Sequence, residues 1–430
     1  MSDLNATVHE TKNGFHVEGY EKIEYDFTLM AYRALTIMDL NIFNLYGQQM
    51  QTYFAHHGLE LKIHKTMIGE KAKSIETFLN IVDSLTDFGV IRKEPVLVVG
   101  GGLVTDVAGN TNFIRIPTTV IGLIDASVSI KVAVNYGNYK NRVGAYHAPM
   151  HTFLDFTFLK SLPEAQVRNG FAELIKTSSC AHLRTFDLLD EFCERLIQTH
   201  FGRLGDETGE AKKVADEINH AGTFEMLKLE TPNLHEIGLD RVIAYGHTWS
   251  LLHELTPAVP LRHGHAISID MAYSGTLANM RGLLSDAEHH RLLNLFSRAG
   301  LSMDHELFNE EVLDKATKAI LETRDGKLRA AVPNPLGKCV FLNDVTTEEM
   351  NAALRRHKEI MKQCPRNGEG IDASVDASDT GYTVNDVPVE QTMKGVNGKM
   401  VNGVTNGISN GMPNGLQKVM ANGYPTGYRN

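Results

Sequence analysis

Short β-rich runs and longer amphipathic runs alternate in the first third of the chain. Asn41–His57 and Ser74–Phe88 repeat their apolar residues with helical spacing, which predicts helices. Between them lie apolar runs of strand length, which predict strands at Ala34–Asp39, Leu59–Ile68, Pro95–Val99 and Phe113–Pro117. Such alternation is typical of a parallel sheet with helices on its faces, so an α/β domain is expected over residues 15–156.

From Pro163 onward the pattern is almost wholly helical, as in EEVLDKATKAILETR, apart from one predicted hairpin within Leu328–Leu342. An α-helical domain is therefore expected over residues 157–366. A cleft between two such domains is a usual place for a small ligand.

The last 64 residues, 367–430, have a different composition, with 11 glycines and 9 asparagines. Asn-Gly pairs recur there and favour turns, and no apolar periodicity connects them. A segment of this kind cannot bury enough apolar surface to offset its ordering entropy, so a disordered tail is expected.

Charge and composition exclude several classes of protein. Acids outnumber bases 52 to 42, a net charge of −10, which argues against nucleic acid or an anionic membrane as partner. The four cysteines form no CxxC pair, which excludes a disulfide scaffold and a cysteine zinc cluster. The N-terminus is polar, so no secretory signal is expected. The chain contains no apolar run of about 18 residues, so no membrane span is expected either. A cytoplasmic protein is expected.

Three segments contain residues suited to chemistry. Glycines 100–102 follow a predicted strand, where they let backbone N–H groups approach a phosphate or serve the turn geometry alone. Asp125, Lys131 and Lys140 lie in otherwise apolar surroundings, either as structural ion pairs or as a pocket for a phosphorylated polyol.

The third group of residues suited to chemistry contains a glutamate and two histidines. Glu173 and Lys176 share a helix face, and His247 and His263 follow on either side of Pro257 and Pro260. Two histidines and a glutamate are a ligand set of catalytic zinc sites. Among nineteen histidines, however, chance pairs are common, so spacing alone leaves this assignment open.

Six motifs stand in order along the chain: VVGGGLVTD, IPTTVIGLIDASVSIK, KNRVGAYH, NGFAELIK, AYGHTWS and HGHAISIDMA. With them the chain resembles the sugar phosphate cyclases related to 3-dehydroquinate synthase, from about Phe15 to Asp372. The segments FHVEGYEKIEYD, ETPNLHE and RNGEGID make it most similar to the desmethyl-4-deoxygadusol synthases of mycosporine biosynthesis. The resemblance implies a Rossmann-like NAD-binding domain followed by an α-helical metal-binding domain.

The resemblance also implies roles for individual residues. The metal ligands are matched by Glu173, His247 and His263. Positions around NAD are matched by Asp39, Glu70, Lys73, Gly101, Gly102, Asp106, Thr118 and Thr119. Catalytic roles are expected for Asp125, Lys131, Lys176, Glu236 and His265, and substrate binding for Lys140, Asn141 and Asp240. His265, two residues from a ligand, is expected to face the substrate and to exchange protons with it.

The family's chemistry accounts for this ensemble. A ring carbinol gives a hydride to NAD⁺ while Zn²⁺, for which Co²⁺ is an alternative, acidifies its hydroxyl. Phosphate then leaves by elimination, the hydride returns, and an intramolecular aldol reaction closes a carbocycle. The lysines hold the anionic groups. The implied partners are a small-molecule sugar phosphate and a second copy of the chain in a homodimer.

Departures from dehydroquinate synthase at three positions concern the substrate. Asp240 and Ala244 stand where that enzyme has an Arg and an Asn for the substrate carboxylate, and Leu251 stands where it has a His. An aspartate repels a carboxylate, so a substrate with a neutral polyol chain at this end, sedoheptulose 7-phosphate, is expected. The 2-epi-5-epi-valiolone synthases use the same substrate and remain the alternative.

The α/β domain looks shortened in two places. Little chain separates Phe27 from Ala34, and Asp106 is followed almost at once by the strand at Phe113. The family has at the second place a further helix and an Arg that contacts phosphate across the dimer. A crossover between parallel strands needs about a dozen residues, so this one is marginal. A non-catalytic homologue is therefore a second alternative.

Overall fold

The computed structural model describes residues 7–11, 14–18, 33–67, 69, 72–108, 111–136, 139–254, 256–376 and 379. The chain divides into two compact units, Met1–Val387 and Pro388–Asn430, and every described residue belongs to the first. Predictions for Glu70, for residues 19–32 and for most of the tail lie outside the described residues.

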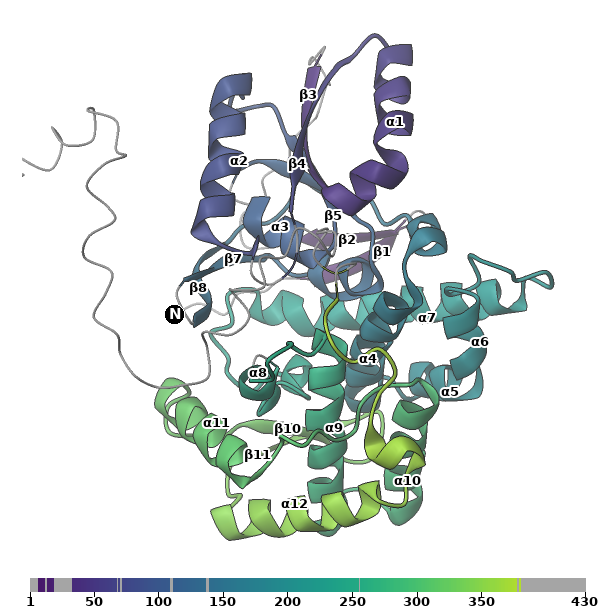
Figure 1. The fold of residues 1–430 in the computed structure, drawn as a ribbon, viewed down its shortest axis with the longest axis vertical. Coiled ribbons are helices and arrows are strands. Elements are labelled where there is room, and N and C mark those ends of the chain that lie inside the picture. Colours follow the sequence, from purple (N-terminus) through teal and green to yellow (C-terminus); the bar gives the residue numbers. More distant parts are fainter. Residues whose placement is uncertain are drawn as a thin grey trace, which may run out of the picture. The chain divides into compact units, whose positions relative to one another are not determined.

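A five-stranded parallel sheet forms the first half of this unit, in the order β4-β3-β5-β6-β9 (Figure 1). The apolar runs of β3, β5 and β6 are buried, as parallel strands covered on both faces require. Four strands of this sheet confirm the predicted ones: β3 (Arg33–Asp39), β4 (Glu60–Thr66), β5 (Val96–Gly100) and β6 (Phe113–Pro117). The fifth strand is β9 (His151–Thr152).

Helices α1 (Leu40–His56) and α2 (Ile75–Phe88) confirm the two predicted helices and lie on opposite sides of β3 and β4 (Figure 1). Asp39 caps α1, because its Oδ1 accepts the amide of Asn41 at 2.7 Å. Ser74 caps α2 in the same way, and Gly89 ends it with a left-handed φ of 66°.

The short crossover between β5 and β6 contains a seven-residue helix, α3 (Gly102–Ala108). On either side of it the strands pair in parallel from Val96 opposite Phe113 to Gly100 opposite Pro117. The sheet therefore forms despite the marginal length of this connection.

Besides α3 and β9, two hairpins and one helical turn of the first half were not predicted. Hairpin β1–β2 pairs Thr7–Thr11 with Gly14–Glu18, and hairpin β7–β8 pairs Lys131–Tyr136 with Tyr139–Tyr146. Between β6 and β7 a π-helical turn, η2, spans Gly122–Ala126. Strand β7 alternates buried and less buried residues, a period of two that its sequence KVAVNY also shows.

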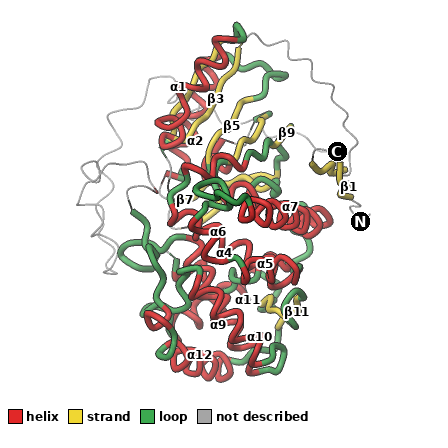
Figure 2. The backbone as a smooth tube through the Cα atoms, turned by 90° about the vertical axis from the view of Figure 1, so that its right-hand side faces the viewer, coloured by secondary structure: helices red, strands yellow, loops and turns green. Residues whose placement is uncertain are grey.

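The second half is helical, as predicted, and its centre is α9 (His263–Met280), which is buried on all sides from Gly264 to Ala278. The predicted hairpin is present as β10 (Ala330–Pro333) and β11 (Cys339–Leu342). The other helices of this half are η3 (Phe156–Ser161), α4 (Glu164–Ala181), α5 (Leu183–Glu191), α6 (Cys193–Gln198), α7 (Glu210–Glu230), η4 (Thr231–Asn233), η5 (Val242–Ala244), α8 (Ser250–His253), α10 (Asp286–Arg298), α11 (Glu310–Thr323), α12 (Thr347–Met361) and η6 (Pro365–Gly368). Of these, α4, α8, α10 and α12 pack against α9 (Figures 1 and 2). Across the described ranges, no helix combines the length and apolarity needed to cross a bilayer.

The predicted boundary at Asn367 falls too early. The Ile371 amide donates to Gly300 O at 2.7 Å, and the Arg262 amide donates to Ala373 O at 2.8 Å. The guanidinium of Arg262, almost fully buried, pairs with Asp376 and Asp379 at 2.8 and 2.9 Å. Because a buried cation needs counter-charges, these residues belong to the helical half. We call residues 371–379 the C-terminal strap.

Two histidines are buried around Thr276 on α9. The Thr276 hydroxyl lies 3.1 Å from His289 Nε2 and 3.0 Å from His357 Nδ1, and His357 Nε2 donates to Met303 O at 2.9 Å. Burial, with a smaller effect of neighbouring His357, lowers the pKa of His289 to about 4, and burial lowers the pKa of His357. Both rings are therefore neutral in the folded protein.

We expect acid to destabilise the fold through these rings. An unfolded histidine takes up a proton near pH 6.5, whereas folded His289 does so only near pH 4. The stabilisation is thus complete above pH 6.5 and is lost as the pH falls towards 4, up to about 3 kcal/mol for this one group. Urea unfolding at pH 7.5 and 5.0 measures it. The variant His289→Gln should flatten the pH dependence, and His290→Gln on the exposed face of α10 should not. Equal slopes in the two variants would contradict this account.

Candidate metal and coenzyme site

Glu173, His247 and His263 converge, although they come from separate segments. Glu173 lies in α4, His247 in the turn before α8, and His263 begins α9. One carboxylate oxygen and one ring nitrogen of each histidine lie within 4.8 Å of one another. A tetrahedral zinc ion with bonds of about 2.1 Å needs its ligand atoms about 3.4 Å apart, so small movements would complete the coordination. The donor set fits zinc.

Close packing of α4 against α9 brings these ligands together. The Gly264 amide donates to Asn169 Oδ1, and a side chain at Gly264 would overlap the Asn169 backbone. The turn that carries His247 is fixed from α9 as well, because buried Asp270 Oδ2 accepts the amides of Trp249 at 2.5 Å and Ser250 at 2.9 Å. The backbone of both helices thus determines where the histidines lie.

Hydrogen bonds on the far side of each ring orient the two histidines. His263 Nδ1 lies 3.3 Å from Glu254 Oε2, while its Nε2 faces Glu173 Oε1 at 3.0 Å. His247 Nδ1 donates to the Tyr245 carbonyl at 3.2 Å, which leaves its Nε2 free for a metal. A carboxylate or carbonyl behind a ligating imidazole is the usual second partner of metal-bound histidine.

The electrostatics of this triad favour a cation at its centre. Burial alone would raise the pKa of Glu173, but Lys176 and His263 outweigh it and hold that pKa well below its usual range. Burial and the charge of Lys176 hold the pKa of His247 low, so this ring is neutral, the form that binds metal. Burial opposes protonation of His263, yet Glu254 and Glu173 raise its pKa to about 10. The carboxylates of Glu173 and Glu254 therefore favour a positive charge between the ligands.

Lys176 connects the triad to the α/β half. Its ammonium contacts Glu173 one turn earlier on α4 and lies 2.9 Å from Asp125 Oδ2 in η2. The side chain is almost fully buried, and the two carboxylates raise its pKa in spite of that burial. Lys176 therefore stays charged and joins the predicted catalytic Asp125 to a metal ligand.

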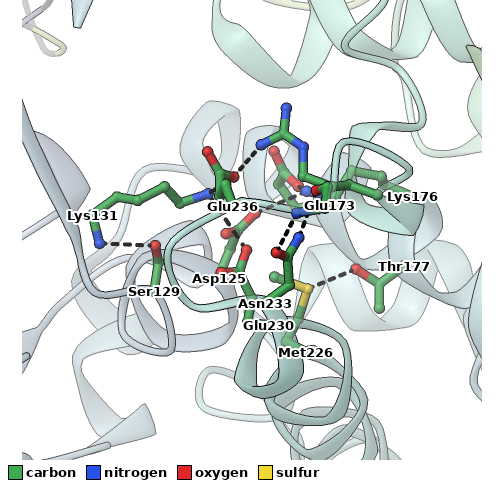
Figure 3. A network of polar contacts seen from close by, with 12 residues as sticks. Asp125, Ser129, Lys131, Glu173, Lys176, Thr177, Met226, Glu230, Asn233 and Glu236 are labelled. Atoms are coloured by element: carbon green, nitrogen blue, oxygen red, sulfur yellow. Dashed lines mark hydrogen bonds and ion pairs between the residues drawn. The ribbon is translucent and has the colours of Figure 1, made fainter. Parts of the chain in front are cut away.

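Lys131 forms a second charged cluster beside the first (Figure 3). Its Nζ lies 2.8 Å from Glu236 Oε1 and 3.4 Å from Glu230 Oε1, and the Arg241 guanidinium also contacts Glu236. Burial opposes ionisation of Glu236, but Lys131 and Arg241 outweigh it and lower its pKa. Burial raises the pKa of Glu230. The two glutamates beside one lysine thus differ in their readiness to hold a proton.

The carboxyl ends of β3 and β5 form the predicted coenzyme edge. Successive strands are added to one side of β3 and then to the other, so the strand order reverses between β3 and β5, where nucleotides bind in such sheets. Asp39 ends β3 and Gly100 ends β5. A Cβ at Gly101 would lie 3.3 Å from Thr119 and one at Gly102 would lie 3.2 Å from Ala126, so this turn is packed closely enough to favour glycine at both positions.

Two further features fit a bound nucleotide at this edge. The buried Thr118 hydroxyl has no hydrogen-bond partner in the described part of the chain. Thr119 Oγ1 instead accepts the Gly122 amide at 3.0 Å and starts η2. Lys73 Nζ lies 2.6 Å from both Asp106 Oδ2 and Asn141 Oδ1, which links predicted coenzyme and substrate residues. Nothing is described for the side chain of Lys140.

His265 does not take part in this arrangement, contrary to its predicted role. It is fully buried, its Nδ1 accepts the Ser302 amide at 3.2 Å, and it packs under Gly370. Two residues on an α-helix are separated by about 200°, so His263 and His265 face opposite sides of α9. Burial, with smaller effects of nearby arginines, lowers the pKa of His265 to about 3. The prediction that it faces substrate is wrong.

Asp240 lies farther out than predicted. It is half exposed, and its Oδ1 accepts a hydrogen bond from Arg329 at 2.6 Å. The neighbouring position Ala244 is buried. A substrate role for Asp240 stays a proposal.

Several residues of the site escaped the sequence analysis. Glu254 and Asp270 act through hydrogen bonds across the fold, and nothing in their spacing marked them. Glu230 was visible as the first residue of the motif ETPNLHE, but only Glu236 was singled out from it. Asn169 likewise opens the motif NGFAELIK.

Comparisons with known proteins agree with this geometry. Residues 63–169 match the family model of the 3-dehydroquinate synthase N-terminal domain, and residues 170–324 match that of the C-terminal domain. The chain is 50% identical over 397 residues to a demethyl-4-deoxygadusol synthase (also written desmethyl-) of Trichormus variabilis, covering 86% of this chain and 97% of that protein. A 2-epi-5-epi-valiolone synthase of Actinoplanes is 38% identical over 337 residues, covering 76% and 84%.

A solved structure supports the fold. The 2-epi-5-epi-valiolone synthase from Streptomyces hygroscopicus, with NAD⁺ and Zn²⁺ bound, superposes with a TM-score of 0.72 at 33% identity. The match covers 80% of this chain and 99% of that one. The predicted two-part fold is therefore confirmed.

Removing the carboxylate behind His263 should weaken metal binding. The variant Glu254→Gln keeps the side-chain size but loses the charge that orients and polarises the imidazole, so we expect zinc affinity to fall about 10- to 100-fold. Competition with a chromophoric chelator measures this affinity. The control is Glu349→Gln, which removes a carboxylate of α12 that pairs with Arg281. This variant should leave the zinc affinity unchanged. Equal affinities for the two variants would refute the role of Glu254.

Proposed function

The chain belongs to the 3-dehydroquinate synthase family of sugar phosphate cyclases, and we propose that it catalyses the reaction of a demethyl-4-deoxygadusol synthase. In this reaction sedoheptulose 7-phosphate is cyclised, loses phosphate and water, and yields the conjugated precursor of mycosporines. The proposal rests on the sequence identity of 50% to such a synthase, in an alignment that covers 97% of that protein. The identity to the valiolone synthase of Actinoplanes is lower, at 38%.

The residues present fit both cofactors of the family. Glu173, His247 and His263 would hold a divalent metal, and the edge formed by Asp39, Gly101, Gly102 and Thr118 would hold NAD. When bound, zinc supplies Lewis acidity to a substrate hydroxyl and NAD⁺ a hydride acceptor that is regenerated within the cycle.

The two lysines would serve the reaction differently because their exposure differs. The side chain of Lys131 is 36% exposed, so it can contact the substrate phosphate or an enolate oxygen directly. That of Lys176 is 3% exposed, so it acts through Asp125 and Glu173, whose positions it determines. Both stay charged near neutral pH, which makes them electrostatic groups and not general bases.

The glutamates beside Lys131 are the candidates for proton transfer. Glu236 is ionised and partly exposed, which suits a proton acceptor. Its backbone has a left-handed φ of 52°, and Asn233 supports this turn with bonds of 2.7 and 2.8 Å to Gly238. Glu230 retains a proton more readily and sits behind the same lysine.

Turnover of sedoheptulose 7-phosphate tests the proposed function. We expect the protein, supplied with NAD⁺ and Zn²⁺, to release phosphate and to form a product with a strong near-ultraviolet band. Lys131→Met should lower kcat/KM about 100-fold, because it removes the accessible cation. Lys160→Met, at an exposed lysine outside the cluster, should leave it unchanged.

The outcomes of this assay distinguish the alternatives. Phosphate release without the ultraviolet band would assign the chain to the valiolone synthases. Absence of phosphate release would support a non-catalytic homologue, for which the short β5–β6 crossover is the structural argument.

We also propose that the protein is a homodimer, as its family resemblance implies, and that it is cytoplasmic. Sedimentation equilibrium at micromolar concentration should give twice the chain mass. A monomer mass under conditions of full activity would contradict the dimer.

A further inference from the structure

Arg115 is a buried cation for which the reaction described so far has no use. It lies on the inner strand β6 and is 1% exposed. Its Nη1 donates to the carbonyls of Ala126 and Ser129, the latter at 3.0 Å. Its Nε and Nη2 have no hydrogen-bond partner in the described ranges. Burial lowers its pKa to about 10, opposed by the carboxylate of Asp106, so the group remains charged at neutral pH.

A buried guanidinium in this state does not stabilise the fold. Unpartnered buried N–H groups are unfavourable, and an apolar side chain of similar volume often fits such a place at lower free energy. Arg33 on β3 of the same sheet shows the contrast. It is partly exposed, pairs with Glu94 at 2.9 Å, and donates to the carbonyls of Phe88 and Gly89 at 3.1 and 3.0 Å. Arg33 has the contacts of a stabilising residue, and Arg115 does not.

The two carbonyls that Arg115 binds belong to one functional segment. Ala126 ends η2, directly after Asp125, and Ser129 precedes Lys131 by two residues. Within the segment the bonds are local: the Ser127 amide donates to Gly122 O at 2.9 Å, and the Lys131 amide to Ser129 Oγ at 3.2 Å. Arg115 adds a connection from the sheet beneath.

We propose that Arg115 is a positioning residue that holds segment 125–131 so that Asp125 reaches Lys176 and Lys131 reaches Glu236. Both of these contacts cross from the α/β half to the helical half. A displacement of the segment would therefore disturb the metal triad through Lys176 and the accessible cation directly. The inference rests on the proposed function for its kinetic consequence, but its structural content is independent of it.

The variants Arg115→Lys and Arg115→Met test this role, with Arg33→Met as the matched control. Lysine keeps the charge but ends one bond short of the two carbonyls, and methionine removes both charge and donors. We expect kcat/KM for sedoheptulose 7-phosphate to fall about 100-fold in the methionine variant and about tenfold in the lysine variant, since small misplacements of catalytic groups have effects of this size. The loss should lie in kcat, and the Kd of NAD⁺ should stay within about twofold, because Gly101, Gly102 and Thr118 lie outside the displaced segment 125–131.

Hydrogen exchange gives a readout that does not need turnover. The amides of Ser127, Ser129 and Lys131 should exchange at least about tenfold faster in both Arg115 variants than in the wild type, and unchanged in Arg33→Met. Unchanged exchange and unchanged kcat, with only a lower melting temperature, would overturn the proposal and leave Arg115 as a structural residue. If the methionine variant does not fold, the lysine variant decides by the same criteria. Wild-type protein that lacks turnover refutes the proposed function, and the exchange comparison still decides the role of Arg115.

Discussion

The arrangement of the site depends on one buried ammonium group, that of Lys176. It lies between Asp125 of the α/β half and Glu173 of the helical half, and its side chain is nearly inaccessible to water. Removing a partner from such an ion pair leaves an uncompensated buried charge, which destabilises by about 3–5 kcal/mol. The pair therefore fixes η2 against α4, and with it the spacing between the coenzyme edge and the metal triad. Chemistry that uses a hydride acceptor and a Lewis acid on one substrate requires that spacing.

The fold was largely predictable because its signals are local. Four strands and two helices of the α/β half coincide with the apolar runs that predicted them, and α9 is buried all round, as its apolar sequence indicates. The metal triad was predictable only through the family motifs, since nineteen histidines offer many chance pairs. Spacing alone could not show that Asn169 and Gly264 bring two helices into contact.

The errors have physical causes too. His265 was assigned to the substrate by its distance in sequence from His263, whereas the rotation of an α-helix turns it to the opposite face. Glu254 and Asp270 were missed because partners that orient a ligand are defined by contacts between remote segments. The boundary at Asn367 was set by composition, and composition does not reveal that a buried Arg262 recruits acids from beyond it.

The C-terminal strap has a consequence for how the protein is made. Arg262 adjoins the ligand His263 but finds its acidic partners more than a hundred positions later in the chain, at Asp376 and Asp379. On a ribosome the sheet with its coenzyme edge can fold while the helical half is still being synthesised, since domains fold as units from the N-terminus. The counter-charges of Arg262, beside the first turn of α9, become available only after the strap has emerged. The surroundings of the ligand His263 are therefore completed late in the synthesis of this chain.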